Sequence, residues 1–196
     1  MRIDEITYGS GIQSLKRSLN IDNSTKIGTC DNLDVYEMDL GNGTCYFLYD
    51  SSTETYLSYV AIDKNISNGY VHLRQIENIS GIKGSVSTLM YFLTRNKNFR
   101  FVISKEEPLT IDGLRWVIAT ISSNRKLFNF KDSSGQSLNV NDLKKEWEDS
   151  RIDPGYSGKI TIFIESVDGN SFNNIFESET GMLHRMYRIF KDEDLV

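Results

Sequence analysis

The hydrophobic period of this chain changes from two to 3.6 near residue 86, and this change constrains the fold more than any other feature. Before it lie four strand-like runs rich in aromatic and β-branched residues. The residues between them include Gly41-Asn42-Gly43 and Asn68-Gly69, which tolerate the positive φ of hairpin turns. The sequence therefore predicts an antiparallel meander of four strands, at Leu33–Leu40, Thr44–Asp50, Tyr56–Asp63 and Tyr70–Asn78.

After the change of period, apolar residues recur at helical spacing. Val86, Leu89, Met90 and Leu93 predict a helix from Ser85 to Asn96. The β-branched and aromatic run at 99–104 predicts a central strand. A second helix is expected from an N-cap at Thr110, with a buried stripe made by Leu114, Val117, Ile118 and Ile121.

Weaker patterns predict the remaining elements. The Asn-, Ser- and Thr-rich residues 21–32 are expected to form a loop. The other expectations are a helix at 11–20 with Ser10 as N-cap, a hairpin of 126–132 with 136–140, a charged helix at 142–149, a strand at 160–167 and an amphipathic helix at 183–190. Together they predict an α+β fold with a mixed, mostly antiparallel sheet flanked by helices.

Composition places the chain among globular proteins, because 39% of its residues are hydrophobic and 25% are charged. No run of eighteen apolar residues and no signal peptide is present, so we expect a cytoplasmic protein without a membrane span. The two cysteines, Cys30 and Cys45, form no CxxC motif and have no histidine nearby. We therefore expect reduced thiols and no metal site.

Charge is unevenly distributed along the chain. The formal net charge is -5, yet residues 95–131 contain eight basic and three acidic residues. Such a segment would attract a phosphate-bearing partner, or would simply form the solvated faces of two helices. Nucleic acid is not the expected partner, although the meander is rich in aromatic residues, because a nucleic-acid-binding domain carries a clearer basic excess.

The turn after the fourth strand is the most specific functional signal. It contains Gly81, Lys83, Gly84 and Ser85 and leads directly into a helix. The first turn of a helix offers unpaired N–H groups and the positive end of the helix dipole, and small residues allow a phosphate to approach them. This turn is therefore a candidate anion site.

In this loop and in the order of their predicted strands and helices, residues 33–140 resemble the GNAT superfamily of N-acetyltransferases. In that family the fourth core strand leads into a pyrophosphate loop of pattern Arg/Gln-x-x-Gly-x-Gly/Ala, followed by a leucine. Gly84 matches the first glycine and Leu89 matches the leucine, whereas Gly81 stands at the Arg/Gln position and Val86 at the Gly/Ala position. The resemblance implies a GNAT-like core at residues 1–140 and an extension of one strand and one helix at 141–196.

The resemblance further implies an acyl-CoA-dependent N-acyltransferase that uses acetyl-CoA or another acyl-CoA. The donor would be bound by residues 81 and 83–87, which are Gly81, Lys83, Gly84, Ser85, Val86 and Ser87. Glu77, near the end of the fourth strand, is the candidate general base, and Tyr91 is a candidate proton donor. A carboxylate solvated at a strand end and a tyrosine packed on a helix are the alternatives.

A second class of function stays open. A catalytically inactive GNAT-like protein, encoded by a phage or mobile element, would act in binding or assembly in the host cytoplasm or the virion. Residues 141–196 lie beyond the elements that the resemblance covers, and an added strand and amphipathic helix often form a protein-partner surface. They would equally serve to cover an open sheet edge.

Overall fold

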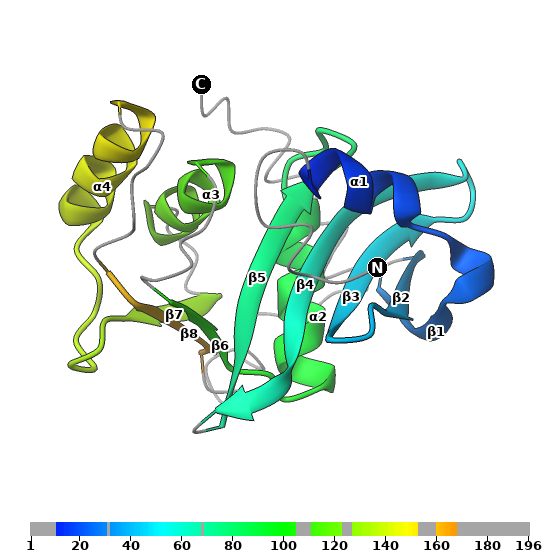
Figure 1. Cartoon of the computed structure of the whole chain (residues 1–196), viewed down its shortest axis with the longest axis horizontal. Helices are drawn as coiled ribbons and strands as arrows, with labels where there is room; N and C mark the ends of the chain where they lie inside the picture. The colour runs from blue at the N-terminus through cyan, green and yellow to red at the C-terminus, as the bar shows by residue number, and fades with distance from the viewer. Residues whose placement is uncertain are drawn as a thin grey trace, which may run out of the picture.

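In the part of the chain that the structure describes, a mixed sheet of eight strands carries the fold, and four α-helices pack around it (Figure 1). The structure, a computed structural model, describes residues 11–30, 32–67, 69–104, 111–122, 127–152 and 160–167. The strands are β1 (Thr25–Cys30), β2 (Leu33–Asp39), β3 (Gly43–Asp50), β4 (Thr55–Ser67), β5 (Tyr70–Asn78), β6 (Phe101–Ile103), β7 (Phe128–Lys131) and β8 (Ile162–Ser166). The helices are α1 (Gly11–Ser18), α2 (Ser85–Asn96), α3 (Ile111–Ser122) and α4 (Val140–Ile152), with a short 3-10 helix η2 (Ile21–Asn23).

The strand order is β1-β2-β3-β4-β5-β6-β8-β7, and every neighbouring pair is antiparallel except β5 and β6. The predicted fold class, an α+β protein with a mixed and mostly antiparallel sheet, is confirmed. The four predicted meander strands are present as β2 to β5. Gly41 has the positive φ, 84°, that its turn requires.

The prediction of a loop at residues 21–32 was wrong, because β1 lies there as a fifth antiparallel strand. β1 is the edge strand of the sheet, and its side chains are exposed or half-buried. Its register with β2 shifts between Lys26 and Gly28. No side chain of β1 is fully buried, and its partly buried apolar residues, Ile27 and Cys30, do not alternate regularly with polar ones, so the sequence showed no strand pattern here.

Helices cover both faces of the meander. α1 lies on one face, where Leu15 and Leu19 pack with Phe47 and Ala61 of β3 and β4. α2 lies on the other face and is buried along nearly its whole length, including the four residues whose spacing predicted it. We call these two sides the α1 face and the α2 face. The aromatic side chains Tyr46, Phe47 and Tyr49 are buried, so they form core and not a surface for stacking bases.

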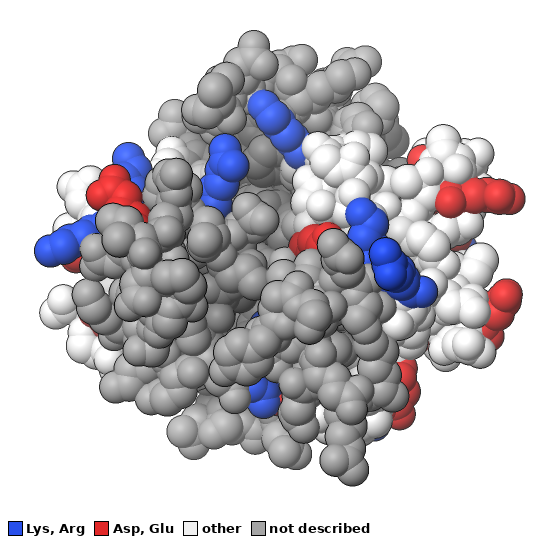
Figure 2. Space-filling model, turned by 45° about the horizontal axis from the view of Figure 1, so that its top comes forward, with Lys and Arg blue, Asp and Glu red and all other residues white. Residues whose placement is uncertain are grey.

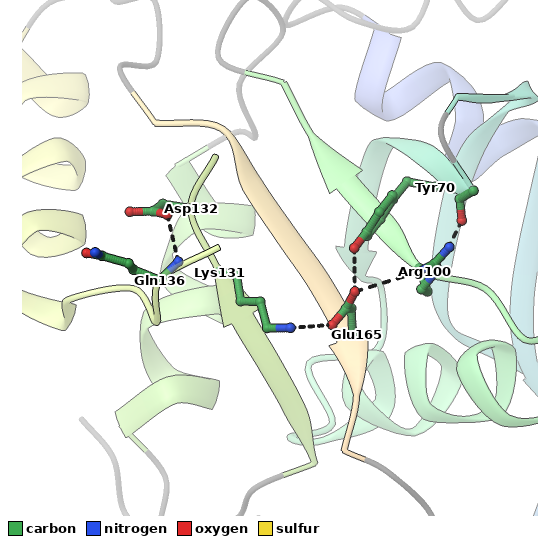
Figure 3. Close-up of polar contacts among 7 residues, drawn as sticks. Tyr70, Arg100, Lys131, Asp132, Gln136 and Glu165 are labelled. Atoms are coloured by element: carbon green, nitrogen blue, oxygen red, sulfur yellow. Dashed lines mark hydrogen bonds and ion pairs between the residues drawn. The ribbon is translucent and has the colours of Figure 1, made fainter. Parts of the chain in front are cut away.

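The last described strand lies inside the sheet. β8 pairs with β6 on one side and with β7 on the other, so the sheet draws on residues on both sides of position 140. The strand predicted at 136–140 is absent. Asp132 Oδ1 instead accepts a hydrogen bond from the backbone N–H of Gln136 (Figure 3) and another from that of Ser134, which forms a tight turn. Asn139 Oδ1 accepts from Asn141 N and caps α4. In the described residues, the predicted hairpin pairing is represented by one isolated β-bridge, between Lys131 and Ser137.

Several predictions lie outside the described residues. They are the N-caps at Ser10 and Thr110 and the amphipathic helix at 183–190. Of the stripe predicted after Thr110, Leu114 and Val117 are buried, and Ile118 and Ile121 are partly buried against the same core. No helix in the described ranges is long and apolar enough to cross a membrane.

The basic segment at 95–131 does not form one cationic surface in the part of the chain that the structure describes. Lys97 pairs with Glu37 of β2, at 2.9 Å, while Arg100 and Lys131 approach Glu165. On the face shown in Figure 2, the described Lys and Arg side chains are dispersed among acidic ones. Three of the five basic residues of this segment that the structure describes thus lie near an acidic side chain.

Glu165 of β8 ties four segments together on the side of the sheet shown in Figure 3. Its carboxylate accepts hydrogen bonds from Tyr70 of β5 and from Lys131 of β7, the latter at 2.8 Å, and Arg100 lies 3.9 Å away. Arg100 also lies over the Tyr70 ring, 4.6 Å from its centre. The bonds from Lys131 and Tyr70 lower the pKa of Glu165, and the bond to Glu165 raises the pKa of Tyr70.

We expect Glu165→Gln to lower the free energy of unfolding by about 1 kcal/mol at neutral pH, because a partly exposed charge-assisted network is lost. The native pKa of Glu165 is depressed, so its contribution is present above the ordinary glutamate pKa of about 4.3 and is lost as the pH falls below it. Urea unfolding at pH 7 and at pH 3.5 measures the effect, with Glu148→Gln on the exposed surface of α4 as the control. A difference between wild type and variant that is the same at both pH values would contradict this account.

Candidate functional site

The loop from β5 to α2 is anchored to the beginning of β4. The backbone N–H groups of Ile79 and Ser80 both donate to Leu57 O, at 2.9 and 3.1 Å. Asn78 Nδ2 donates to Ile82 O, at 2.9 Å, and Ile82 N donates to Ser80 Oγ, at 3.2 Å. The position of the α2 N-terminus is therefore fixed by hydrogen bonds before any ligand binds.

Gly84 is the N-cap of α2, and its conformation requires glycine. Its φ of 89° lies in the left-handed region, and as glycine it offers no side chain to cap the helix. Gly81 also has positive φ, 74°, and like Lys83 it is exposed. The loop thus leaves the first N–H groups of α2 to be satisfied by something other than an N-cap side chain.

Val86 points into the core, where it is 6% exposed and belongs to the cluster packed between α2 and the sheet. The sequence places this β-branched residue where a GNAT pyrophosphate loop has Gly or Ala. Because its side chain is buried with the other apolar residues of α2, its bulk is directed to the sheet and not to the free end of the helix.

Two serine hydroxyls near this end of α2 are buried and lack a hydrogen-bond partner within the described structure. They are Ser85 Oγ, in the first turn of α2, and Ser58 Oγ, on β4 opposite Asn78. Ser85 is 4% exposed and Ser58 is fully buried. A buried hydroxyl without a partner costs about 1–3 kcal/mol, so such groups need an explanation. A third hydroxyl, Ser87 Oγ, accepts a hydrogen bond from the Trp116 indole N–H of α3, at 3.0 Å.

β5 and β6 are paired only at their beginnings. Val71 and His72 lie opposite Phe101 and Val102, and no further pair joins these strands in the described ranges. The carboxyl ends of the two parallel strands therefore diverge at the end of the sheet where α2 begins. In open α/β sheets, ligands bind in the crevice outside the carboxyl ends of the parallel strands.

Glu77 lies near this carboxyl end of β5, on the α1 face. Its Oε2 accepts a hydrogen bond from Tyr59 Oη of β4, at 2.7 Å. Tyr59 is fully buried, and burial, followed by the neighbouring Glu77 carboxylate, raises its pKa. Tyr59 therefore stays protonated at neutral pH and holds one carboxylate oxygen of Glu77 in place.

Tyr91 is buried in the core, 7% exposed, about two turns along α2 from Ser85. Burial raises its pKa. The structure thus brings Glu77 and the α2 N-terminus to the same end of the sheet, and it places Tyr91 deeper in the core. No group of three His, Cys, Asp or Glu side chains among the described residues could hold a metal ion.

Trp116 and Gln75 were not predicted as site residues from the sequence, and Tyr59 was noted only as one of the aromatic residues of the meander. Trp116 lies between the positions of the apolar stripe predicted after Thr110, and no pattern of polar residues around it indicated a site. Gln75 did leave a signal, because the apolar positions of β5 change from odd numbers, Val71 and Leu73, to the even number Ile76. That change indicates a β-bulge, which the structure has at Arg74.

Comparison of the chain with models of protein families, with curated proteins and with solved structures found no match.

Proposed function

We propose that the protein is a GNAT-like acyltransferase that binds acyl-CoA at the N-terminus of α2 and transfers the acyl group to an amine. The observation that carries this proposal is the buried, unpartnered hydroxyl of Ser85 in the first turn of α2. It lies behind a left-handed Gly84, at the divergent carboxyl ends of the two parallel strands. Each of these features suits a phosphate group.

The residues of the loop fit a pyrophosphate group. The N–H groups of Val86 and Ser87, in the first turn of α2, would bind its oxygens together with the Ser85 hydroxyl. Ser85 would then supply the side-chain donor that Gly81 cannot supply at the Arg/Gln position of the family pattern. Lys83, exposed in the same loop, adds positive charge.

Because the carboxyl ends of β5 and β6 diverge, a ligand bound at the N-terminus of α2 would reach between them to Glu77 on the α1 face. Bound acyl-CoA would supply a thioester, whose carbonyl carbon forms a C–N bond while its C–S bond breaks and the thiolate leaves, taking a proton from solvent. Glu77, oriented by Tyr59, would accept the proton that the amine loses. The chain thereby offers an anion site and a base in one region.

The first prediction concerns donor binding. Acetyl-CoA at 1 mM should raise the melting temperature of the wild-type protein, because it binds only the folded state. Ser85→Ala should weaken this binding about tenfold, because a hydrogen bond to a charged group is lost, yet it should leave the stability of the free protein nearly unchanged. Ser51→Ala, on an exposed turn, is the matched control. Wild type that shows no shift with acetyl-CoA contradicts the proposal.

The second prediction concerns the base. Glu77→Gln should lower kcat for acetyl transfer to an amine about 100-fold, because proton acceptance is lost, and should leave the affinity for acetyl-CoA unchanged. Glu148→Gln, on the exposed surface of α4, should retain full turnover. If wild type binds acetyl-CoA but transfers no acetyl group to any amine in a broad panel, the alternative of a catalytically inactive binding protein is correct.

A further inference from the structure

Gln75 of β5 is the most anomalous polar side chain that the structure describes. It is 6% exposed, and neither its Oε1 nor its Nε2 has a hydrogen-bond partner. An amide carries two donors and an acceptor with two lone pairs, so burying one without any partner is costly. Such groups are rare in folded proteins, and each one needs an explanation.

A β-bulge determines where Gln75 points. Ala61 of β4 lies opposite Gln75, but the next residue, Ile62, lies opposite Leu73, so Arg74 is an extra residue in β5. With regular alternation from Leu73, which packs in the α2-face core, Gln75 would also lie on the α2 face. The bulge instead gives Gln75 the face of its partner Ala61, which is the α1 face.

The same face carries Glu77, two residues further along β5, opposite Tyr59. Residues two apart on a strand lie about 7 Å apart between Cα atoms and point to the same side. Two neighbouring polar side chains are paired, since Glu77 accepts from Tyr59 and Arg74 Nε donates to Asp63, at 2.8 Å. Gln75, next to the proposed base, lacks such a partner.

We propose that Gln75 binds the acyl acceptor, and that this acceptor is an amine with an amide group close to its amino group, as at the N-terminus of a peptide. This inference rests on the proposed function, because it takes Glu77 as the base that receives the amine proton. The Oε1 of Gln75 would accept a hydrogen bond from the N–H of the acceptor's first amide, and its Nε2 would donate one to the C=O of that amide. Gln75 would thus bind one peptide group through two hydrogen bonds. An amine without an amide would leave Gln75 unpaired and would bind more weakly.

The test uses two probes, alanyl-alanine amide and n-butylamine, which share a primary amine and differ in the amide groups. In 15N-labelled full-length protein, millimolar alanyl-alanine amide should shift the side-chain NH2 resonances of Gln75, and n-butylamine should not. Gln75→Met, which is similar in volume and apolar, should raise the KM for alanyl-alanine amide at least tenfold with a smaller change in kcat, and should leave the KM for n-butylamine unchanged.

The outcomes separate this inference from the proposed function. Gln75 resonances that stay fixed while wild type acetylates amines in a Glu77-dependent manner overturn the role of Gln75 and leave the acyltransferase proposal standing. Gln75 resonances that move with the dipeptide amide, in a protein that does not bind acetyl-CoA, overturn the acyltransferase proposal and support Gln75 as a binding residue for peptide amines. The resonance experiment on the wild-type protein tests whether Gln75 binds the acceptor even if Gln75→Met fails to fold.

Discussion

The parallel pairing of β5 with β6 is the contact on which the rest of the structure depends. It joins an antiparallel meander of five strands to the three-stranded group of β6, β8 and β7. Parallel neighbours cannot be connected by a tight turn, so the chain must cross over, and α2 forms that crossover. α2 is buried from Ser85 to Thr94, whereas the other described helices carry exposed side chains.

The same pairing creates the candidate site. It ends after His72 and Val102, so the carboxyl ends of β5 and β6 diverge where the loop from β5 returns the chain to the start of α2. The helix then presents its N-terminus at the one end of the sheet where a parallel pair opens. One local rule, that buried polar groups are hydrogen-bonded, is broken there at Ser58, Ser85 and Gln75. Local rules of this kind are broken most often at functional sites.

Elements with a strong period were predictable from the sequence, and elements set by their neighbours were not. β2 to β5 and α2 followed from alternation, turn residues and the spacing of Val86, Leu89 and Leu93. β1 was missed because an exposed edge strand needs no apolar alternation, and the false strand at 136–140 arose because the capping role of Asn139 was not recognised.

In the candidate site, too, some features could be predicted from the sequence and others could not. The anion site at residues 81–87 is predicted from glycine and serine in a turn before a helix, and Glu77 from its place near a strand end; both stay predictions. The direction of the Val86 side chain, the hydrogen bond from Tyr59 and the orientation of Gln75 depend on tertiary packing and on one extra residue at Arg74. A single sequence carries little of that information. The exception is the shift of the apolar positions of β5 from odd to even residue numbers at Ile76.

The central claim is that the N-terminus of α2 binds the phosphate groups of acyl-CoA. Backbone amide resonances recorded during a titration with acetyl-CoA test it most directly, because each N–H reports its own surroundings. The account predicts that the largest shifts fall at Gly84, Ser85, Val86 and Ser87. Saturable shifts confined to other segments, such as the surroundings of Arg100 and Lys131, or no shifts at millimolar acetyl-CoA, would contradict it.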